Sequence, residues 1–328
     1  AVRLRLQPPP DPIQTAGVVW PDFAVVLLTE EGSVLASDNT TKLQVANVRA
    51  MGLLQGAESA VLVSAGVGTF SGFLATVAEE ISFDIVDQAG VLPRLSNIQI
   101  QVFPAAAAHL VFLNEFQPQT TDAGVAQGAP IRLQLLDLFQ NLMTESTAQI
   151  RLSVMEGPTT SLQLFWEQNL SESFVDFVDV TLNTAGHYRL IATLVAENLY
   201  SSPSQAFEVI PGVPSHVDFS LYPEPTQQVA QPWSPFAVEV RDIFNNRVDW
   251  DNSSNLTASL DDLTGTAVPF VGVSSRQAAA GLVEFTNLST HTAGLLQLHV
   301  DTTSGAIRGT ENVPISVLPG RAISVEIS

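Results

Sequence analysis

Short segments in which apolar and polar residues alternate recur along the whole chain. Residues 131–135 read Ile-Arg-Leu-Gln-Leu and residues 236–240 read Phe-Ala-Val-Glu-Val, with apolar side chains at i, i+2 and i+4. A period of two is the pattern of a β-strand with one buried face. No apolar stripe with the 3.6-residue period of a helix continues for more than a turn or two. The pattern therefore predicts an all-β fold.

The strand pattern repeats along the chain. Phe70, Phe177 and Phe285 stand in corresponding places, 107 and 108 residues apart. A proline that follows an alternating strand recurs with the same spacing, at residues 104, 211 and 319. A repeat of this length, built from short strands, predicts a row of immunoglobulin-like β-sandwich domains.

The recurring prolines divide the chain into domains. We place immunoglobulin-like sandwiches at residues 1–104 (the diverged copy), 105–211 and 212–319. Residues 320–328 are then either the first strand of a further repeat or a strand donated to a neighbour. Proline fixes φ and donates no hydrogen bond to a sheet, so it ends one strand before the next begins. Because the linkers are so short, they are not free hinges. We expect a semi-rigid, elongated rod, and a chain that is a segment of a longer array or a processed product.

Two sequence blocks recur in the second and third copies. Asp-x-Phe-x-Asn stands at residues 137–141 and 242–246 and predicts a turn, because Asp and Asn bond their own backbone and tolerate left-handed angles. Thr-Ala-Gly stands at residues 184–186 and 292–294, where the first copy has Ala78-Glu79-Glu80. With these blocks the chain resembles the immunoglobulin-like repeats of bacterial surface proteins and, more distantly, filamin-type repeats. The resemblance implies the fold of adhesins, stalks, and filament or sheath subunits.

Composition narrows the range of partners. The 328 residues carry a net charge of −20 that is spread over all three copies, so nucleic acid and anionic membranes would repel the chain. No stretch approaches the ~20 apolar residues that a membrane-spanning helix needs, so we expect no direct membrane insertion. Hydrophobic residues make up 45% of the chain and charged residues only 14%. Either large sandwich cores or faces that pack against neighbouring chains explain this excess.

The sequence lacks the motifs of catalysis. There is no cysteine, which excludes disulfides and thiol chemistry. No Gly-x-Ser-x-Gly elbow, phosphate-binding glycine loop or histidine pair with metal-ligand spacing occurs. His109 and His216 stand in corresponding places, just before the predicted first strand of the second and third copies, which favours a packing role. We predict that the chain is not an enzyme and holds no catalytic residue or cofactor.

One loop of the third copy has features of a calcium loop. Asp249, Asp251, Ser253 and Asn255 place oxygen-bearing side chains at alternate positions, as at the start of such a loop. The glycine at position six and the glutamate at position twelve are missing. A solvated loop is therefore the preferred interpretation, and calcium the alternative.

The chain also contains five Asn-x-Ser/Thr sequons, which would carry glycans if the protein is made in a eukaryotic secretory pathway. They begin at Asn39, Asn169, Asn252, Asn255 and Asn287.

Four tryptophans offer apolar contact area. Trp20 and Trp233 stand in matching places just before a strand, which favours core packing at the end of a sandwich over a platform for carbohydrate stacking. Trp166 and Trp250 have no counterparts in the other copies and are candidates for surface contacts.

The sequence is compatible with three functional hypotheses. The leading one is an extracellular or cell-surface structural protein, a stalk, filament or sheath subunit. It would associate with neighbouring chains, either copies of itself or other components of a surface assembly. The second is a cell-surface adhesin or carbohydrate-binding array that contacts glycans through loop tips or exposed tryptophans. The third is a set of accessory domains of a larger enzyme.

Overall fold

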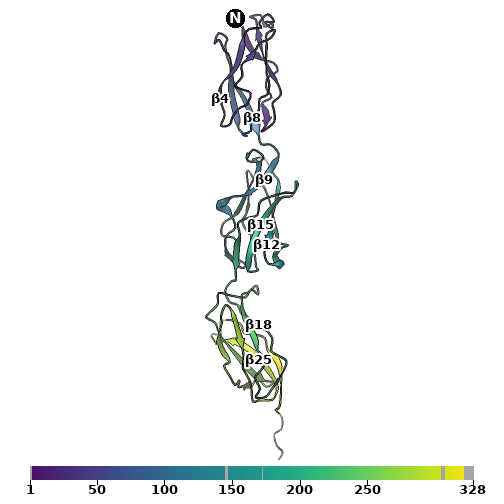
Figure 1. The fold of residues 1–328 in the computed structure, drawn as a ribbon, viewed down its shortest axis with the longest axis vertical. Coiled ribbons are helices and arrows are strands. Elements are labelled where there is room, and N and C mark those ends of the chain that lie inside the picture. The colour runs from purple at the N-terminus through teal and green to yellow at the C-terminus, as the bar shows by residue number, and fades with distance from the viewer. Residues whose placement is uncertain (1, 145–146, 172, 304–306, 321–328) are drawn as a thin grey trace, which may run out of the picture.

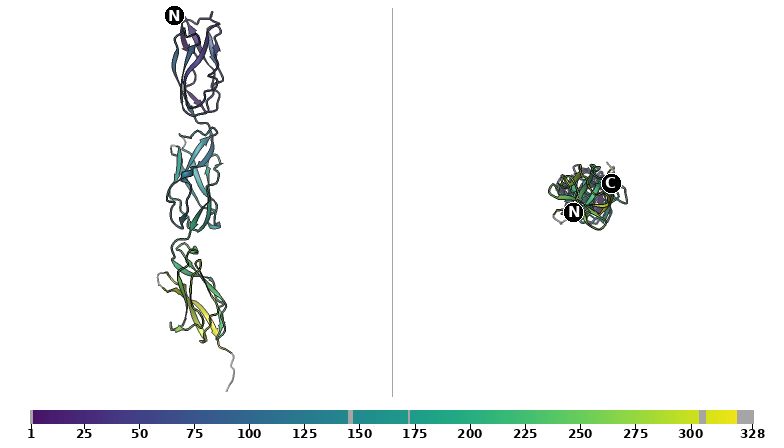
Figure 2. Two further views of the ribbon diagram at one scale, coloured as in Figure 1. Left: turned by 60° about the vertical axis from the view of Figure 1, so that its left-hand side comes forward. Right: turned by 90° about the horizontal axis from the view of Figure 1, so that it is seen from below.

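The computed structural model describes residues 2–144, 147–171, 173–303 and 307–320 (Figure 1). Within these ranges the regular structure consists of β-strands and two 3₁₀ turns, at Asn114–Phe116 and Thr159–Ser161. Three β-sandwiches follow one another along the long axis, and the end-on view in Figure 2 shows them overlapping. The all-β, tandem immunoglobulin-like architecture predicted from the alternating pattern is confirmed.

The first sandwich packs a small sheet against a larger one. In the small sheet, β3 (Phe23–Leu28) lies between β1 (Arg3–Leu6) and β6 (Val67–Phe70), with antiparallel pairing throughout. The larger sheet has the order β2 (Ile13–Thr15), β8 (Leu95–Phe103), β7 (Glu80–Asp87), β4 (Lys42–Arg49) and β5 (Val61–Leu62). Burial alternates along β7, as a strand with one face on the core requires.

The second sandwich has the same plan. Its small sheet has the order β14 (Phe174–Phe177), β11 (Ile131–Asp137) and β9 (Ala107–Phe112). Its larger sheet has the order β10 (Thr121–Asp122), β17 (Phe207–Ile210), β15 (Gly186–Leu194), β12 (Gln149–Glu156) and β13 (Phe165–Asn169), and β16 (Leu199–Tyr200) pairs with β15.

The third sandwich repeats this plan again. The small sheet has the order β18 (His216–Leu221), β20 (Phe236–Arg241) and β24 (Leu282–Phe285). The larger sheet has the order β19 (Thr226–Gln228), β26 (Val313–Leu318), β25 (Gly294–Thr302), β21 (Asn255–Asp262) and β22 (Ala267–Val268), and β23 (Ser275–Gln277) pairs with β21. In each sandwich a short second strand runs parallel to the last strand, at β2/β8, β10/β17 and β19/β26.

The recurring phenylalanine belongs to the core of each sandwich. Phe70 stacks on Phe23 across the small sheet with ring centroids 5.2 Å apart, and Phe285 stacks on Phe236 at 5.0 Å. In the second sandwich Phe177 lies opposite Ile131 in the same register. All three recurring rings are almost fully buried. The repeat seen in the sequence is therefore a repeat of core packing.

Each sandwich has its own hydrophobic core, built from residues between 4 and 102, 110 and 209, and 217 and 317. Trp20 and Trp233 belong to the first and third cores and are 2% and 3% exposed, so their predicted packing role is confirmed. We keep residues 1–104, 105–211 and 212–319 as the proposed domain limits. The predicted strand at the C-terminal end lies outside the described residues from position 321 onward.

Candidate functional site: the domain junctions

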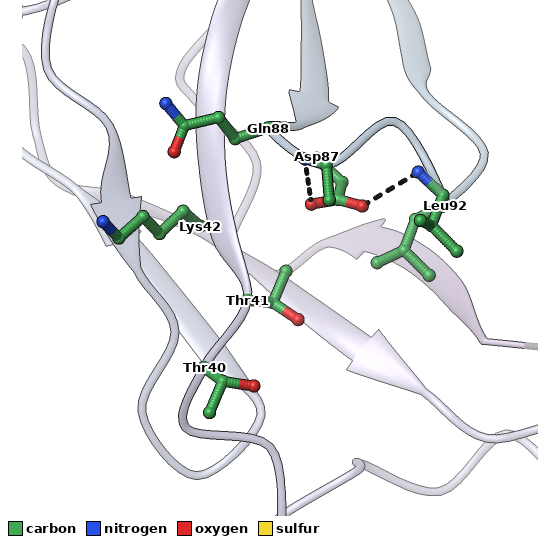
Figure 3. Close-up of a pocket in the computed structure, with 8 residues that line it drawn as sticks. Thr40, Thr41, Lys42, Asp87, Gln88 and Leu92 are labelled. Carbon is green, nitrogen blue, oxygen red and sulfur yellow. Dashed lines mark hydrogen bonds between the residues drawn. The ribbon is translucent and has the colours of Figure 1, made fainter.

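The described part of the chain holds no group of three or more His, Asp or Glu side chains arranged for a metal ion. A pocket of about 480 Å³ lies in the first domain, beside the start of β4 at Lys42 and the end of β7 at Asp87. Figure 3 shows residues that line it. Thr41, Lys42 and Leu92 help to line it. The carboxylate of Asp87 beside it accepts hydrogen bonds from the amides of Ala89 (3.0 Å) and Val91 (3.1 Å), so it closes a turn. This pocket gathers no reactive pair of side chains.

A network of side-chain hydrogen bonds lies between the domains. At the first junction Asp137 ends β11, and its Oδ1 accepts the amides of Phe139 (2.8 Å) and Asn141 (2.9 Å). Its Oδ2 accepts the amide of Ala105 in the linker (2.8 Å) and the Nδ2 donor of Asn141 (2.8 Å). The carboxylate is fully buried. The turn predicted from the sequence forms, and the same carboxylate also holds the linker.

Asn141 carries the contact across the junction. Its Oδ1 accepts the amide of Ala78 (2.8 Å), and its Nδ2 donates to the carbonyl of Thr76 (2.8 Å). Thr76 and Ala78 lie in the loop between β6 and β7 of the first domain. One amide side chain thus bonds a donor and an acceptor two residues apart on the preceding domain, which fixes both position and orientation.

The hydrogen bonds of Asp137 and Asn141 recur between the same kinds of atoms at the second junction. Asp242 accepts the linker amide of Gly212 (2.9 Å) and the Nδ2 donor of Asn246 (2.8 Å). Asn246 accepts the amide of Ala185 (2.9 Å) and donates to the carbonyl of Asn183 (2.8 Å). The recurrence at two places in one chain shows that the arrangement belongs to the repeat.

The phenylalanine of the block packs on a glycine of the preceding domain. A Cβ atom added to Gly17 would lie 2.1 Å from a ring carbon of Phe139, and one added to Gly124 would lie 2.1 Å from a ring carbon of Phe244. Both glycines have left-handed backbone angles, with φ of +74° and +78°. Only glycine meets both demands without strain. We call the Asp, Phe and Asn of each block the junction clamp, and the groups that they contact on the preceding domain the receptor face.

Trp250 adds a contact at the second junction. Its indole Nε1 donates to the carbonyl of Pro211 in the linker (3.1 Å), while half of the residue remains exposed. Trp166 lies in β13 and packs partly buried against the core of the second domain. Of the two tryptophans predicted to make surface contacts, Trp250 thus lies half-exposed at a junction and Trp166 packs partly buried against a core. Glycan binding by either one stays an untested hypothesis.

The electrostatics of the clamp favour an ionised aspartate. Burial raises the pKa of the Asp137 carboxyl. The hydrogen bonds that it accepts from the Asn141 side chain and from the amides of Ala105, Asn141 and Phe139 lower the pKa by a larger amount. The pKa of Asp137 therefore lies below its ordinary value of 3.8. A carboxylate with several donors is stabilised in its charged form, which is the form that bonds the linker.

The calcium candidates form a turn. Asp251 is 2% exposed, and its Oδ1 accepts the amides of Ser253 (2.9 Å) and Ser254 (3.1 Å). The first copy has an equivalent turn, in which Asp38 accepts the amides of Thr40 and Thr41. Asp249 and Asn255 are exposed. A solvated loop stays the prediction and calcium the alternative.

Two of the sequon asparagines use their side chains in equivalent loops. Oδ1 of Asn39 accepts the amide of Ala65, and Oδ1 of Asn252 accepts the amide of Ala280, both at 2.8 Å. All five sequon asparagines are exposed, including the other three, which are Asn169, Asn255 and Asn287. Glycosylation at any of the five stays a prediction.

The fold and the junctions together define a rod of tandem immunoglobulin-like domains. Among solved structures, the chain is similar to FdeC, an Escherichia coli adhesin, with 13% identity and a TM-score of 0.45 over 97% of this chain and 96% of that one. It is similar to Yersinia pseudotuberculosis InvD, with 11% identity and a TM-score of 0.39 over 96% and 97%. It is also similar to invasin, a bacterial integrin-binding protein, with 11% identity and a TM-score of 0.35 over 97% of this chain and 60% of invasin. No protein-family model and no curated protein matches the chain. Because the identities are low and the TM-scores are below 0.5, we take no functional conclusion from these similarities.

Proposed function

We propose that this chain is a stiff spacer in a cell-surface protein of the adhesin type, which holds a protein-binding element away from the surface that anchors it. The observation that supports the proposal is the junction clamp, which occurs with the same contacts at both junctions. At each junction a buried aspartate holds the linker, an asparagine bonds the preceding domain twice, and an aromatic ring fills the space above a glycine.

Rigidity is the property that such contacts provide. Interfaces between domains of one chain are commonly small and permit relative motion. Here the linker amide is itself a hydrogen-bond donor to the clamp, at Ala105 and at Gly212, so bending a junction would break several contacts at once. A rod with fixed junctions transmits a fixed distance and direction, which a stalk or spacer requires.

The charge of the chain favours a spacer over a filament that packs side by side. A net charge of −20 on a rod of this length makes copies repel one another along their whole length, particularly at low salt. Within the described residues no helix is long and apolar enough to cross a membrane. In this proposal other parts of the assembly supply anchoring and recognition, and the partner is a protein.

Distance measurements across the junctions test the mechanical part of this proposal. The chain has no cysteine, so pairs of single cysteines can be introduced and spin-labelled without background. Labels at the exposed residues Asp179 and Glu284 span the second junction. Pulsed electron double resonance should give one narrow distance distribution in the wild-type background, and a broad one would contradict the spacer.

Surface exposure tests the location. In intact cells that produce the protein, an antibody against an epitope tag on the chain, or an added protease, should reach the chain. A cytosolic marker in the same cells serves as the control. If the chain resists protease until the cells are lysed, the extracellular assignment is wrong even when the rod is stiff.

A further inference from the structure

The receptor face exists in three copies, of which two are occupied by described residues of this chain. In the first domain it consists of Gly17, the carbonyl of Thr76 and the amide of Ala78. In the second it consists of the equivalent groups of Gly124, Asn183 and Ala185. Both of these faces lie at the end of their domain that carries the recurring proline, where the next described domain begins.

The third domain builds the same face from Ala230, His291 and Ala293. The amide of Ala230 donates to the carbonyl of Thr290 (2.9 Å), as Gly17 donates to Ala75 (2.8 Å) and Gly124 to Leu182 (2.9 Å) in the other domains. His291 and Ala293 follow Thr290 at the positions of the two clamp-binding groups. All three receptor residues are exposed. No described residue forms a hydrogen bond with the His291 carbonyl or the Ala293 amide.

The linker position is also repeated. Gly320 follows Pro319 just after β26, as Gly212 follows Pro211 just after β17. At the second junction the amide of Gly212 is the group that binds Asp242. The third domain therefore offers a carbonyl, a loop amide and a linker residue in the places where a clamp binds.

One difference changes what this face accepts. Ala230 stands where the first two faces have glycine, and it keeps the left-handed backbone, with φ of +54°. Its Cβ occupies the place that lies 2.1 Å from a ring carbon of the clamp phenylalanine at the other junctions. Carbon atoms pack at about 3.5–4.0 Å, so a phenylalanine seated in the same way cannot fit.

A second copy of this chain does not supply a matching clamp. In the first domain the equivalent turn is Thr29-Glu-Glu-Gly-Ser33, closed by the Thr29 amide on the Ser33 carbonyl, as Asp137 is closed on Asn141. Glu31 then stands at the phenylalanine position, and Ser33 lacks the paired donor and acceptor of an amide side chain. The two glutamate carboxylates of this turn would add repulsion between two acidic chains.

We propose that the third receptor face binds a further domain of the same kind, one whose clamp keeps the aspartate and the asparagine but has a small side chain in place of the phenylalanine. The size of the side chain at the phenylalanine position of the clamp then decides which receptor face a domain can bind. The junctions therefore encode the order of the domains in such an array. This inference rests on the junction geometry and is independent of the extracellular role.

A four-domain chain tests the inference. Residues 213–319 are appended directly after Gly320, so that the new junction has the same Pro-Gly-Val linker as the second one. Spin labels at Glu284 in the third domain and in the appended copy report on the new junction. Three versions are compared: the appended copy unchanged, the appended copy with Phe244→Ala, and the acceptor Ala230→Gly facing an unchanged appended copy.

The expected result is a broad distance distribution for the unchanged copy and narrow distributions for the other two. Adding Asn246→Ala to the appended copy of the Ala230→Gly version should broaden its distribution again. Broad distributions in all three versions would overturn the receptor face, and a narrow one for the unchanged copy would overturn the selection by size. Thermal unfolding of each version shows that the appended domain is folded.

Discussion

Removing the amide of Asn246 tests the junction clamp most directly. Asn246→Ala abolishes the hydrogen bonds to the Ala185 amide and the Asn183 carbonyl, which are the bonds that this side chain makes across the second junction. Each hydrogen bond contributes about 0.5–1.5 kcal/mol net, so the two together contribute roughly 1–3 kcal/mol. A change of that size shifts the equilibrium between a closed and an open junction roughly 5- to 150-fold.

The assay is the distance distribution between spin labels at Asp179 and Glu284, which lie on either side of the second junction. We expect the narrow wild-type peak to broaden in Asn246→Ala. The matched control is Asn141→Ala, which removes the same contacts at the first junction and should leave the Asp179–Glu284 distribution unchanged. If Asn246→Ala leaves the distribution as narrow as wild type, or if both variants broaden it equally, the clamp does not hold the junction in the way described.

The remaining predictions concern the glycine, the acid response, the linker tryptophan and the core. Gly124→Ala should loosen the second junction because its Cβ would collide with the Phe244 ring, and adding Phe244→Ala should partly restore it; independent, additive effects on the label distances would contradict this coupling. Because the pKa of Asp137 is lowered on folding, its stabilisation is complete above the unfolded value of about 3.8 and is lost as pH falls through the folded value. Urea unfolding between pH 7 and pH 2.5 should therefore show a smaller acid loss for Asp137→Asn than for wild type, and equal losses would refute this. Trp250→Phe removes the bond to the Pro211 carbonyl and should broaden the second junction while leaving the first, which has no such contact among its described residues, as it was. Phe285→Ala should destabilise the third domain by about 3–5 kcal/mol in denaturant unfolding, with Phe285→Leu costing less, and a loss spread over all three domains would contradict their separate cores.

The strand pattern and the repeat could be derived from the sequence because they are local. Alternation along residues 131–135 and 236–240 marks which side chains face the core, and β11 and β20 form there. The spacing of Phe70, Phe177 and Phe285 was informative because each ring occupies the same place in its own core. Such signals need only the neighbours of a residue along the strand and across it.

The junction clamp was visible in the sequence only as a turn. Asp137 and Asn141 form the turn that their residue types predict, yet the carbonyl and amide that Asn141 also bonds lie 65 and 63 residues away. No pattern along the chain predicts the contact between Gly17 and Phe139, because this contact depends on how two folded domains meet. A comparison of residues 137–141 with residues 242–246 shows that Asp, Phe and Asn recur. That these three side chains together bind the preceding domain follows only from where that domain lies.

The sequence by itself determined three all-β domains, their order and the short linkers between them, because strand periodicity and proline act over a few residues. Tertiary structure alone decided that the linkers are held and that the recurring turn is the device that holds them. It also decided that Ala230 matters, because an alanine in place of a glycine has a consequence only where an aromatic ring of the next domain must lie against it.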